Sequence, residues 1–177
     1  MKTGKQLILI AFLATTIVVA KLSLSYLPNI ELVTLLFIIY ASVLPKKIAY
    51  IIPFVFVTIE MVLWGFGEWV IGYYIIWSLL VTLVISMKST LKTNADYWAI
   101  FAGCYGLLFG IIFALIHAFF YGFSFGIAYW LKGLTFDIIH CFSNYLIVLL
   151  LYTPLYTRFT KLLTRWEINY GYHDKSR

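Results

Sequence analysis

The sequence predicts an all-α integral membrane protein, a single bundle of six transmembrane helices over residues 1–177. Of the 177 residues, 63% are hydrophobic and 11% are charged, whereas a soluble domain carries about 25% charged residues. The mean hydropathy is +0.96, and a spanning helix needs about 20 residues, which leaves room for about six spans. The apolar runs also lack the alternation of a membrane barrel. This composition excludes a soluble enzyme, a nucleic-acid-binding protein and a secreted disulfide scaffold.

The first apolar run predicts a span over residues 6–25. It follows Lys2 and Lys5, and such a start is also typical of a cleaved signal peptide. No clear A-x-A site follows, however, and hydrophobicity resumes after Lys21. We therefore expect an uncleaved helix here.

Three short spans are predicted next, over residues 29–44, 48–64 and 69–86. Proline, lysine and glycine separate them, as in Pro45-Lys46-Lys47 and Gly65-Phe66-Gly67. Helices of this length barely cross about 30 Å of hydrocarbon, so we expect tilted helices or an end that opens into a cavity.

The last two spans are predicted over residues 97–120 and 132–157, and residues 170–177 read as a polar tail. The connection between the two spans is rich in rings and contains Gly122 and Gly126. Two glycines within a run of rings suit a flexible loop that folds over a flat ligand.

Basic residues predict that both termini are cytoplasmic. Cytoplasmic loops of membrane proteins are enriched in Lys and Arg. With the N-terminus inside, only Lys21 and Lys132 fall outside. The inner basic residues are Lys2, Lys5, Lys46, Lys47, Lys88, Lys92, Arg158, Lys161, Arg165, Lys175 and Arg177.

Ionisable residues gather in the outer half of the predicted bundle. Such groups are costly in a bilayer, about 2.5–3.5 kcal/mol each, so each requires a reason. The inner half is nearly uniformly apolar, which indicates an outward-facing polar pocket rather than a pore. The six residues are Glu31, Glu60, Glu68, His117, Asp137 and His140.

The sixth span carries the clearest polar face. Asp137, His140, Cys141 and Asn144 are spaced i, i+3, i+4 and i+7 and therefore share one side of a helix. A carboxylate one turn from an imidazole can bond it and leave its other nitrogen for a ligand. The alternative is a polar clamp that only holds the helices together.

Other polar residues also have structural interpretations. Glu60 could form a salt bridge with Lys21 or Lys132, and His117 could be a satisfied core histidine. Glu31 and Glu68 could be plain interfacial residues.

Aromatic residues accompany the polar ones at the outer ends. Membrane proteins commonly carry aromatic belts at the interface, which accounts for part of this enrichment. Rings beside convergent polar groups also suit a small planar ligand. The candidate pocket residues are Glu60, Trp64, Trp77, His117, Trp130, Asp137, His140 and Asn144.

Catalytic, cofactor and metal motifs are missing from the sequence. There is no P-loop, no G-x-S-x-G and no H-E-x-x-H, and three histidines are too few for a membrane di-iron site. Cys104 and Cys141 both lie within apolar runs. We expect no enzyme activity, no cofactor, no metal site and no ATPase within this chain.

Several segments resemble the substrate-binding S components of energy-coupling factor (ECF) vitamin transporters. The similarity covers nearly the whole chain, which has the same length and expected number of spans. It is carried by residues 27–36, Trp64-Gly65-Phe66-Gly67, Gly106-Leu107-Leu108-Phe109-Gly110 and residues 136–144.

The resemblance implies a function. S components are six-helix proteins that capture a vitamin near the extracellular face of the bacterial plasma membrane, under loops that act as lids. They dock on a membrane T component bound to two cytoplasmic ATPases. The segments look most like a group assigned to vitamin B6 or the thiamine pyrimidine precursor, and we expect a pyridoxine-type or hydroxymethylpyrimidine ligand. Riboflavin, pantothenate, folate, queuosine precursors and corrinoids stay open.

The resemblance also implies a docking face on the first helix, where the family commonly has A-x-x-x-A. The nearest matches here are Ala11-x-x-x-Thr15 and Thr16-x-x-x-Ala20, small residues that allow close helix approach.

Two other classes of protein share the expected topology. One is a membrane-embedded enzyme that uses Asp137 and His140, and the other is a structural membrane subunit.

Overall fold

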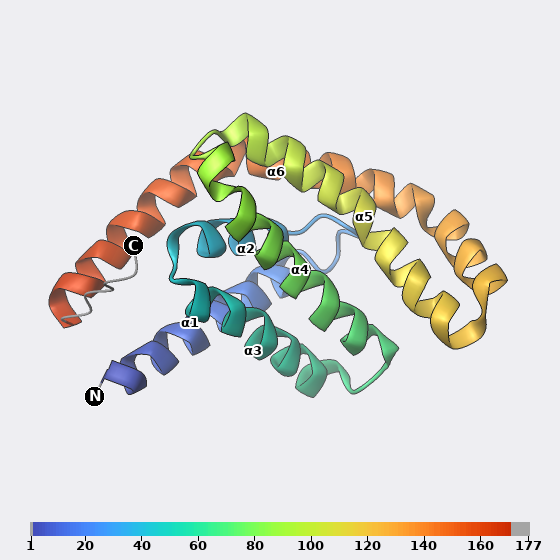
Figure 1. The fold of residues 1–177 in the computed structure, drawn as a ribbon, viewed down its shortest axis with the longest axis horizontal. Helices are drawn as coiled ribbons and strands as arrows, with labels where there is room; N and C mark the ends of the chain where they lie inside the picture. The colour runs from blue at the N-terminus through green and yellow to red at the C-terminus, as the bar shows by residue number, and fades with distance from the viewer. Residues whose placement is uncertain (1, 171–177) are drawn as a thin grey trace.

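The chain forms six α-helices in a computed structural model that describes residues 2–170 (Figure 1). The described residues contain no strand, so the predicted all-α class is confirmed. The predicted polar tail lies almost entirely outside these residues. The helices are α1 (Lys2–Ser23), α2 (Val33–Val43), α3 (Lys46–Trp64), α4 (Glu68–Leu91), α5 (Ala95–Tyr121) and α6 (Phe123–Tyr170).

Five of the described helices, α1, α3, α4, α5 and α6, are long and apolar enough to cross a membrane. Their outward sides carry large apolar side chains, such as Val62, which is 76% exposed. Exposed apolar surface on this scale is unsuited to water and suited to lipid. The start of α1 and the end of α6 lie at one end of the molecule, opposite the α5–α6 turn (Figure 1). The protein has the architecture of a multi-pass α-helical membrane protein.

The second predicted span, 29–44, is wrong in length. α2 has 11 residues and is therefore about 16 Å long, too short to cross a bilayer. Its late start has a local cause: Asn29 has a φ of 57°, and the Glu31 carboxylate accepts a bond of 2.9 Å from the Thr34 N–H. A left-handed residue followed by this cap sets the start of the helix four residues after the predicted one.

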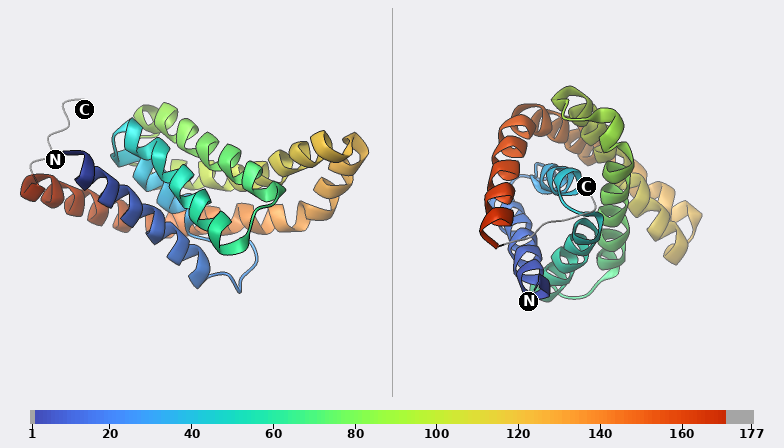
Figure 2. Two further views of the ribbon diagram at one scale, coloured as in Figure 1. Left: turned by 90° about the horizontal axis from the view of Figure 1, so that it is seen from below. Right: turned by 60° about the vertical axis from the view of Figure 1, so that its left-hand side comes forward.

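α2 is the buried centre of the fold. It contacts each of the other five helices, and most of its residues are buried. The other helices touch in the order α1, α3, α4, α5, α6. Figure 2 shows α2 enclosed by them.

The predicted flexible loop between the last two spans is a helical hairpin. Gly122, with a φ of 92°, is the single residue between α5 and α6. Gly126 lies inside α6 where a Cβ would come within 2.7 Å of the Ala114 carbonyl oxygen of α5. The first glycine thus makes the turn, and the second lets the two helices touch. The hairpin extends beyond the other helices (Figures 1 and 2).

α6 is much longer than the predicted span over 132–157. Its 48 residues correspond to about 72 Å of helix. Its N-terminal part includes residues that were expected to form the loop, and its C-terminal part continues past Pro154. Its C-terminal part changes direction (Figure 1), as expected for a helix with an internal proline.

Candidate ligand-binding site

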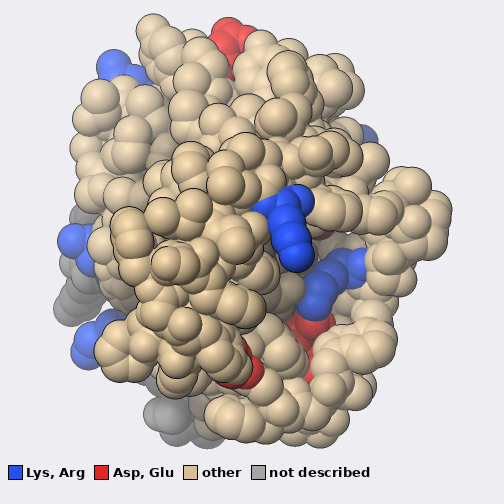
Figure 3. Space-filling view, turned by 90° about the vertical axis from the view of Figure 1, so that its right-hand side faces the viewer, with Lys and Arg blue, Asp and Glu red and all other residues tan. Residues whose placement is uncertain are grey.

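Two adjoining cavities open near the end of the bundle at which the hairpin lies. The inner cavity has a volume of about 170 Å³ and the wider cavity about 570 Å³. Asn29, Tyr73 and Phe109 line both. Figure 3 views this end, where basic and acidic side chains meet in a hollow on a mostly uncharged surface.

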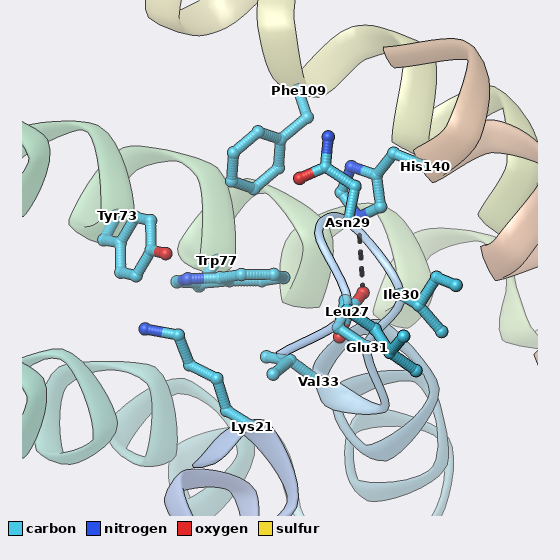
Figure 4. A pocket seen from close by; sticks show the side chains of 10 residues that line it. All are labelled: Lys21, Leu27, Asn29, Ile30, Glu31, Val33, Tyr73, Trp77, Phe109 and His140. Atoms are coloured by element: carbon cyan, nitrogen blue, oxygen red, sulfur yellow. Dashed lines mark hydrogen bonds and ion pairs between the residues drawn. The ribbon is translucent and has the colours of Figure 1, made fainter. Parts of the chain in front are cut away.

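The inner cavity is lined by the connection between α1 and α2 together with α1, α2, α4, α5 and α6. Because α2 begins only at Val33, no helical turn occupies the space at its N-terminal end, where the inner cavity lies. Figure 4 shows the ten lining residues, which are Lys21, Leu27, Asn29, Ile30, Glu31, Val33, Tyr73, Trp77, Phe109 and His140.

A buried ion pair lies at one side of the inner cavity. Lys21 of α1 pairs with Glu60 of α3, whose side chain is fully buried. The Lys21 ammonium also lies 5.1 Å from the centre of the Tyr73 ring, within the range of a cation–π contact. Glu60 Oε1 has no hydrogen-bond partner among the described residues. The salt-bridge interpretation of Glu60 is confirmed, with Lys21 as the partner.

A second charged contact lies across the inner cavity. His140 Nε2 of α6 is 3.4 Å from Glu31 Oε1, and the His140 ring centre is 5.1 Å from that of Phe109. The predicted bond between Asp137 and His140 is wrong. The α1–α2 connection brings Glu31 to the imidazole, whereas the Asp137 carboxylate lies against Gly110 of α5.

Three aromatic residues, Tyr73, Trp77 and Phe109, also line the inner cavity. The Trp77 ring centre is 5.8 Å from that of Phe109 and 5.9 Å from that of Tyr73. Trp77 Nε1 is buried without a hydrogen-bond partner among the described residues. Together the rings and the two charged contacts can stack on a flat molecule and exchange hydrogen bonds with its edge.

Four of the eight predicted pocket residues line the two cavities. Trp77 and His140 line the inner cavity, and Trp130 and Asp137 line the wider one. Two more lie just behind these walls. Glu60 holds Lys21, and Asn144 is buried, with its Nδ2 donating to Thr34 Oγ1 at 3.4 Å.

Two predicted pocket residues line neither the inner nor the wider cavity. His117 is 3.4 Å from Glu68 Oε2 and lines a third cavity of about 340 Å³. This cavity adjoins the wider one, because Trp69, Phe113 and Tyr129 line both. Trp64 is 62% exposed at the end of α3, and it lines neither cavity. Trp64 of α3 therefore faces outward, whereas Trp77 of α4 and Phe109 of α5 face the inner cavity.

The predicted docking residues lie on the outer side of α1. Ala11 and Thr15 are exposed, and Thr16 and Ala20 are half-buried. Their side chains are small, so this strip of α1 is available for close approach by another helix.

Sequence reasoning left Lys21, Asn29 and Phe109 out of the pocket. Lys21 has a signal, because it is one of only two basic residues placed outside by the topology. The sequence signal for Asn29 is weaker: it follows Pro28 in a turn. No sequence signal marks Phe109 as a pocket residue, since it is one of 15 phenylalanines.

Asn29 fastens the α1–α2 connection to α6. Its Nδ2 donates to the Phe136 carbonyl oxygen at 2.9 Å, and its own carbonyl oxygen accepts from Ser143 Oγ at 2.6 Å. Because Asn29 also lines both cavities, these bonds hold the part of the α1–α2 connection that lines the site in place.

We expect Asn29→Ala to be more destabilising than Asn29→Gly, by about 1 kcal/mol in the free energy of unfolding. Both variants lose the bond to Phe136, and only alanine is strained at a φ of 57°. Denaturant titration of both variants in detergent measures the difference. Equal losses would show that backbone conformation at this position does not matter.

The described residues contain no group of three His, Cys, Asp or Glu side chains that could hold a metal ion. In comparisons of the chain with family models, with curated proteins and with solved structures, no match was found.

Proposed function

We propose that this protein is the substrate-capturing subunit of a membrane transporter and binds a small, flat, ring-containing molecule in the inner and wider cavities. The observation that carries the proposal is the inner cavity, which combines three rings with two charged contacts. Small-molecule sites are largely apolar concave spaces with a few placed polar groups, and this cavity has that composition.

The size and chemistry of the inner cavity favour a vitamin-like heterocycle. A volume of about 170 Å³ suits one six-membered ring with its substituents. Lys21 supplies a hydrogen-bond donor and Glu31 an acceptor, while His140 can supply either. A pyridoxine-type B6 vitamer or hydroxymethylpyrimidine matches these groups.

The transport role rests on the resemblance to ECF S components and on the absence of a P-loop. In this proposal a separate T component and two cytoplasmic ATPases supply the energy. The small side chains Ala11, Thr15, Thr16 and Ala20 contact the T component. The basic end of the bundle faces the cytoplasm of a bacterial cell, and the cavities open outward.

Native mass spectrometry of the purified protein tests this function first, followed by calorimetry with a vitamin panel. We expect one small heterocycle bound per chain and released chemically unchanged. Turnover of the molecule would instead support the enzyme alternative. A protein that stays empty and refuses the panel would support the structural alternative.

We expect Phe109→Leu to weaken binding of that heterocycle about tenfold, because it removes one of the two aromatic rings that line both cavities. Phe119→Leu is the matched control, since Phe119 lies on the same helix, is 84% exposed and lines neither cavity. Calorimetry on both variants measures the effect. Equal affinities would place the ligand elsewhere.

A further inference from the structure

Asp137 is a buried acidic residue that forms no ion pair in the described part of the chain. Its residue is 6% exposed, and Oδ2 has no hydrogen-bond partner in the described part of the chain. None of the ion pairs formed by residues 2–170 includes it. Burying an unpaired charge is costly, so this arrangement indicates a group that arrives from outside the protein.

The other acidic groups near the cavities already have basic partners. Glu60 is paired with Lys21, and Glu31 with His140. Lys132 also lines the wider cavity, but it is exposed and forms no ion pair with Asp137. Among the described residues, the acidic side chain in the buried part of this lining therefore has no ion-pair partner.

Aromatic residues form most of the lining of the cavity that Asp137 also lines. Seven of the twelve residues that line the wider cavity are aromatic. The faces of aromatic rings attract cations, and a set of rings beside a carboxylate is an arrangement that recognises organic ammonium groups. The seven are Trp69, Tyr73, Phe109, Phe113, Tyr129, Trp130 and Phe136.

Gly110 leaves room for the carboxylate in this position. A Cβ at Gly110 would overlap the Asp137 carboxylate group, with Cγ at 2.5 Å. The carboxylate thus lies directly against the backbone of α5, in space that any side chain at position 110 would fill.

We propose that the wider cavity binds a positively charged group of the ligand, an ammonium or a protonated ring nitrogen, with Asp137 as its counter-charge and the surrounding rings as its cage. This inference rests on the proposed function and narrows the substrate to cationic heterocycles. Ligands with a phosphate or carboxylate group are disfavoured, because they would bring a second negative charge to Asp137.

Calorimetry with matched pairs of ligands tests the inference. The first pair is pyridoxamine with pyridoxine, and the third is benzylammonium with benzyl alcohol. The second pair is a methylated aminopyrimidine that carries an aminomethyl group in one compound and a hydroxymethyl group in the other. Within each pair only the charged group differs. We expect the natural protein to prefer the amine of a pair by about tenfold or more.

Asp137→Asn removes the charge and keeps the shape. We expect it to weaken amine binding about tenfold and to leave alcohol binding within about threefold. Asp96→Asn is the control, because Asp96 is exposed in the first turn of α5. Trp130→Leu, at a residue 36% exposed, is a second variant that also lowers the preference for amines. Thermal melting confirms that each variant is folded.

The outcomes separate the two proposals. If the natural protein binds the amine and the alcohol of a vitamin pair equally well, Asp137 is not the counter-charge, but vitamin capture still stands. The same conclusion follows if Asp137→Asn weakens binding of the amine and of the alcohol to a similar extent. A preference for benzylammonium with no vitamin bound supports the cation site and contradicts vitamin capture. If no amine of the three pairs binds, the cation site is overturned, and the wider vitamin panel decides the proposed function.

Discussion

Replacing Lys21 with methionine is expected to lower the free energy of unfolding by about 3 kcal/mol. Methionine keeps most of the apolar stem and removes the ammonium, which leaves the fully buried Glu60 carboxylate without a cation. Breaking a buried pair from one side is strongly destabilising because the remaining charge is uncompensated. Chemical denaturation in detergent, followed by circular dichroism, measures the loss.

A double-mutant cycle tests whether the loss comes from the pair. The double variant Lys21→Met with Glu60→Gln buries no charge, and we expect it to recover most of the stability. Lys132→Met is the matched control, because Lys132 is exposed and should tolerate the change. If the Lys21 and Glu60 effects simply add, the two residues are not coupled.

Gly106→Ala is expected to separate α5 from α6, with a loss of about 1–3 kcal/mol in stability. A Cβ at Gly106 would lie 2.8 Å from the His140 carbonyl carbon and 2.9 Å from the Cys141 nitrogen. These are backbone atoms, so no side-chain rotation can relieve the overlap. Because His140 lines the inner cavity, its displacement should also weaken ligand binding.

Gly103→Ala provides a graded comparison on the same helix. Its nearest neighbour would be the Cys141 carbonyl oxygen at 3.3 Å, a tight contact that a small shift can accommodate. We therefore expect a smaller loss of stability and nearly unchanged affinity. Melting curves and calorimetry on both variants measure these effects, and equal behaviour of the two would contradict the close contact at Gly106.

The helical class could be predicted from composition and hydropathy, because a bilayer admits few other spanning structures. The length of α2 could not, because Ile30 and Leu32 are as apolar as the helix that follows. The positive φ of Asn29 and the cap by Glu31 decide where this helix begins. Neither changes the average hydropathy of the segment.

Glycine has two roles in membrane helices, and sequence alone does not separate them. Gly122 and Gly126 were both interpreted as loop residues, and only Gly122 makes a turn. Gly126 provides room for α5, and its contact with Ala114 and Ala118 depends on two helices already being packed together.

The candidate site could be predicted in part. The inward face of α6 follows from a spacing of three and four residues, and Asp137, His140 and Asn144 are all buried. The partner of His140 could not be predicted, because Glu31 is 109 residues away along the chain. The outward orientation of Trp64 could not be predicted either, because it depends on which side of α3 packs against the neighbouring helices, and the local sequence pattern does not reveal that.

The shortness of α2 also has a consequence for how the chain enters a membrane during synthesis. An isolated segment needs about 20 apolar residues to insert, and α2 has 11. It must therefore be inserted together with α1 or α3, and its backbone is shielded only once the other helices have closed around it. We therefore expect the helix that leaves space for a ligand to become stable only after the helices around it have packed together.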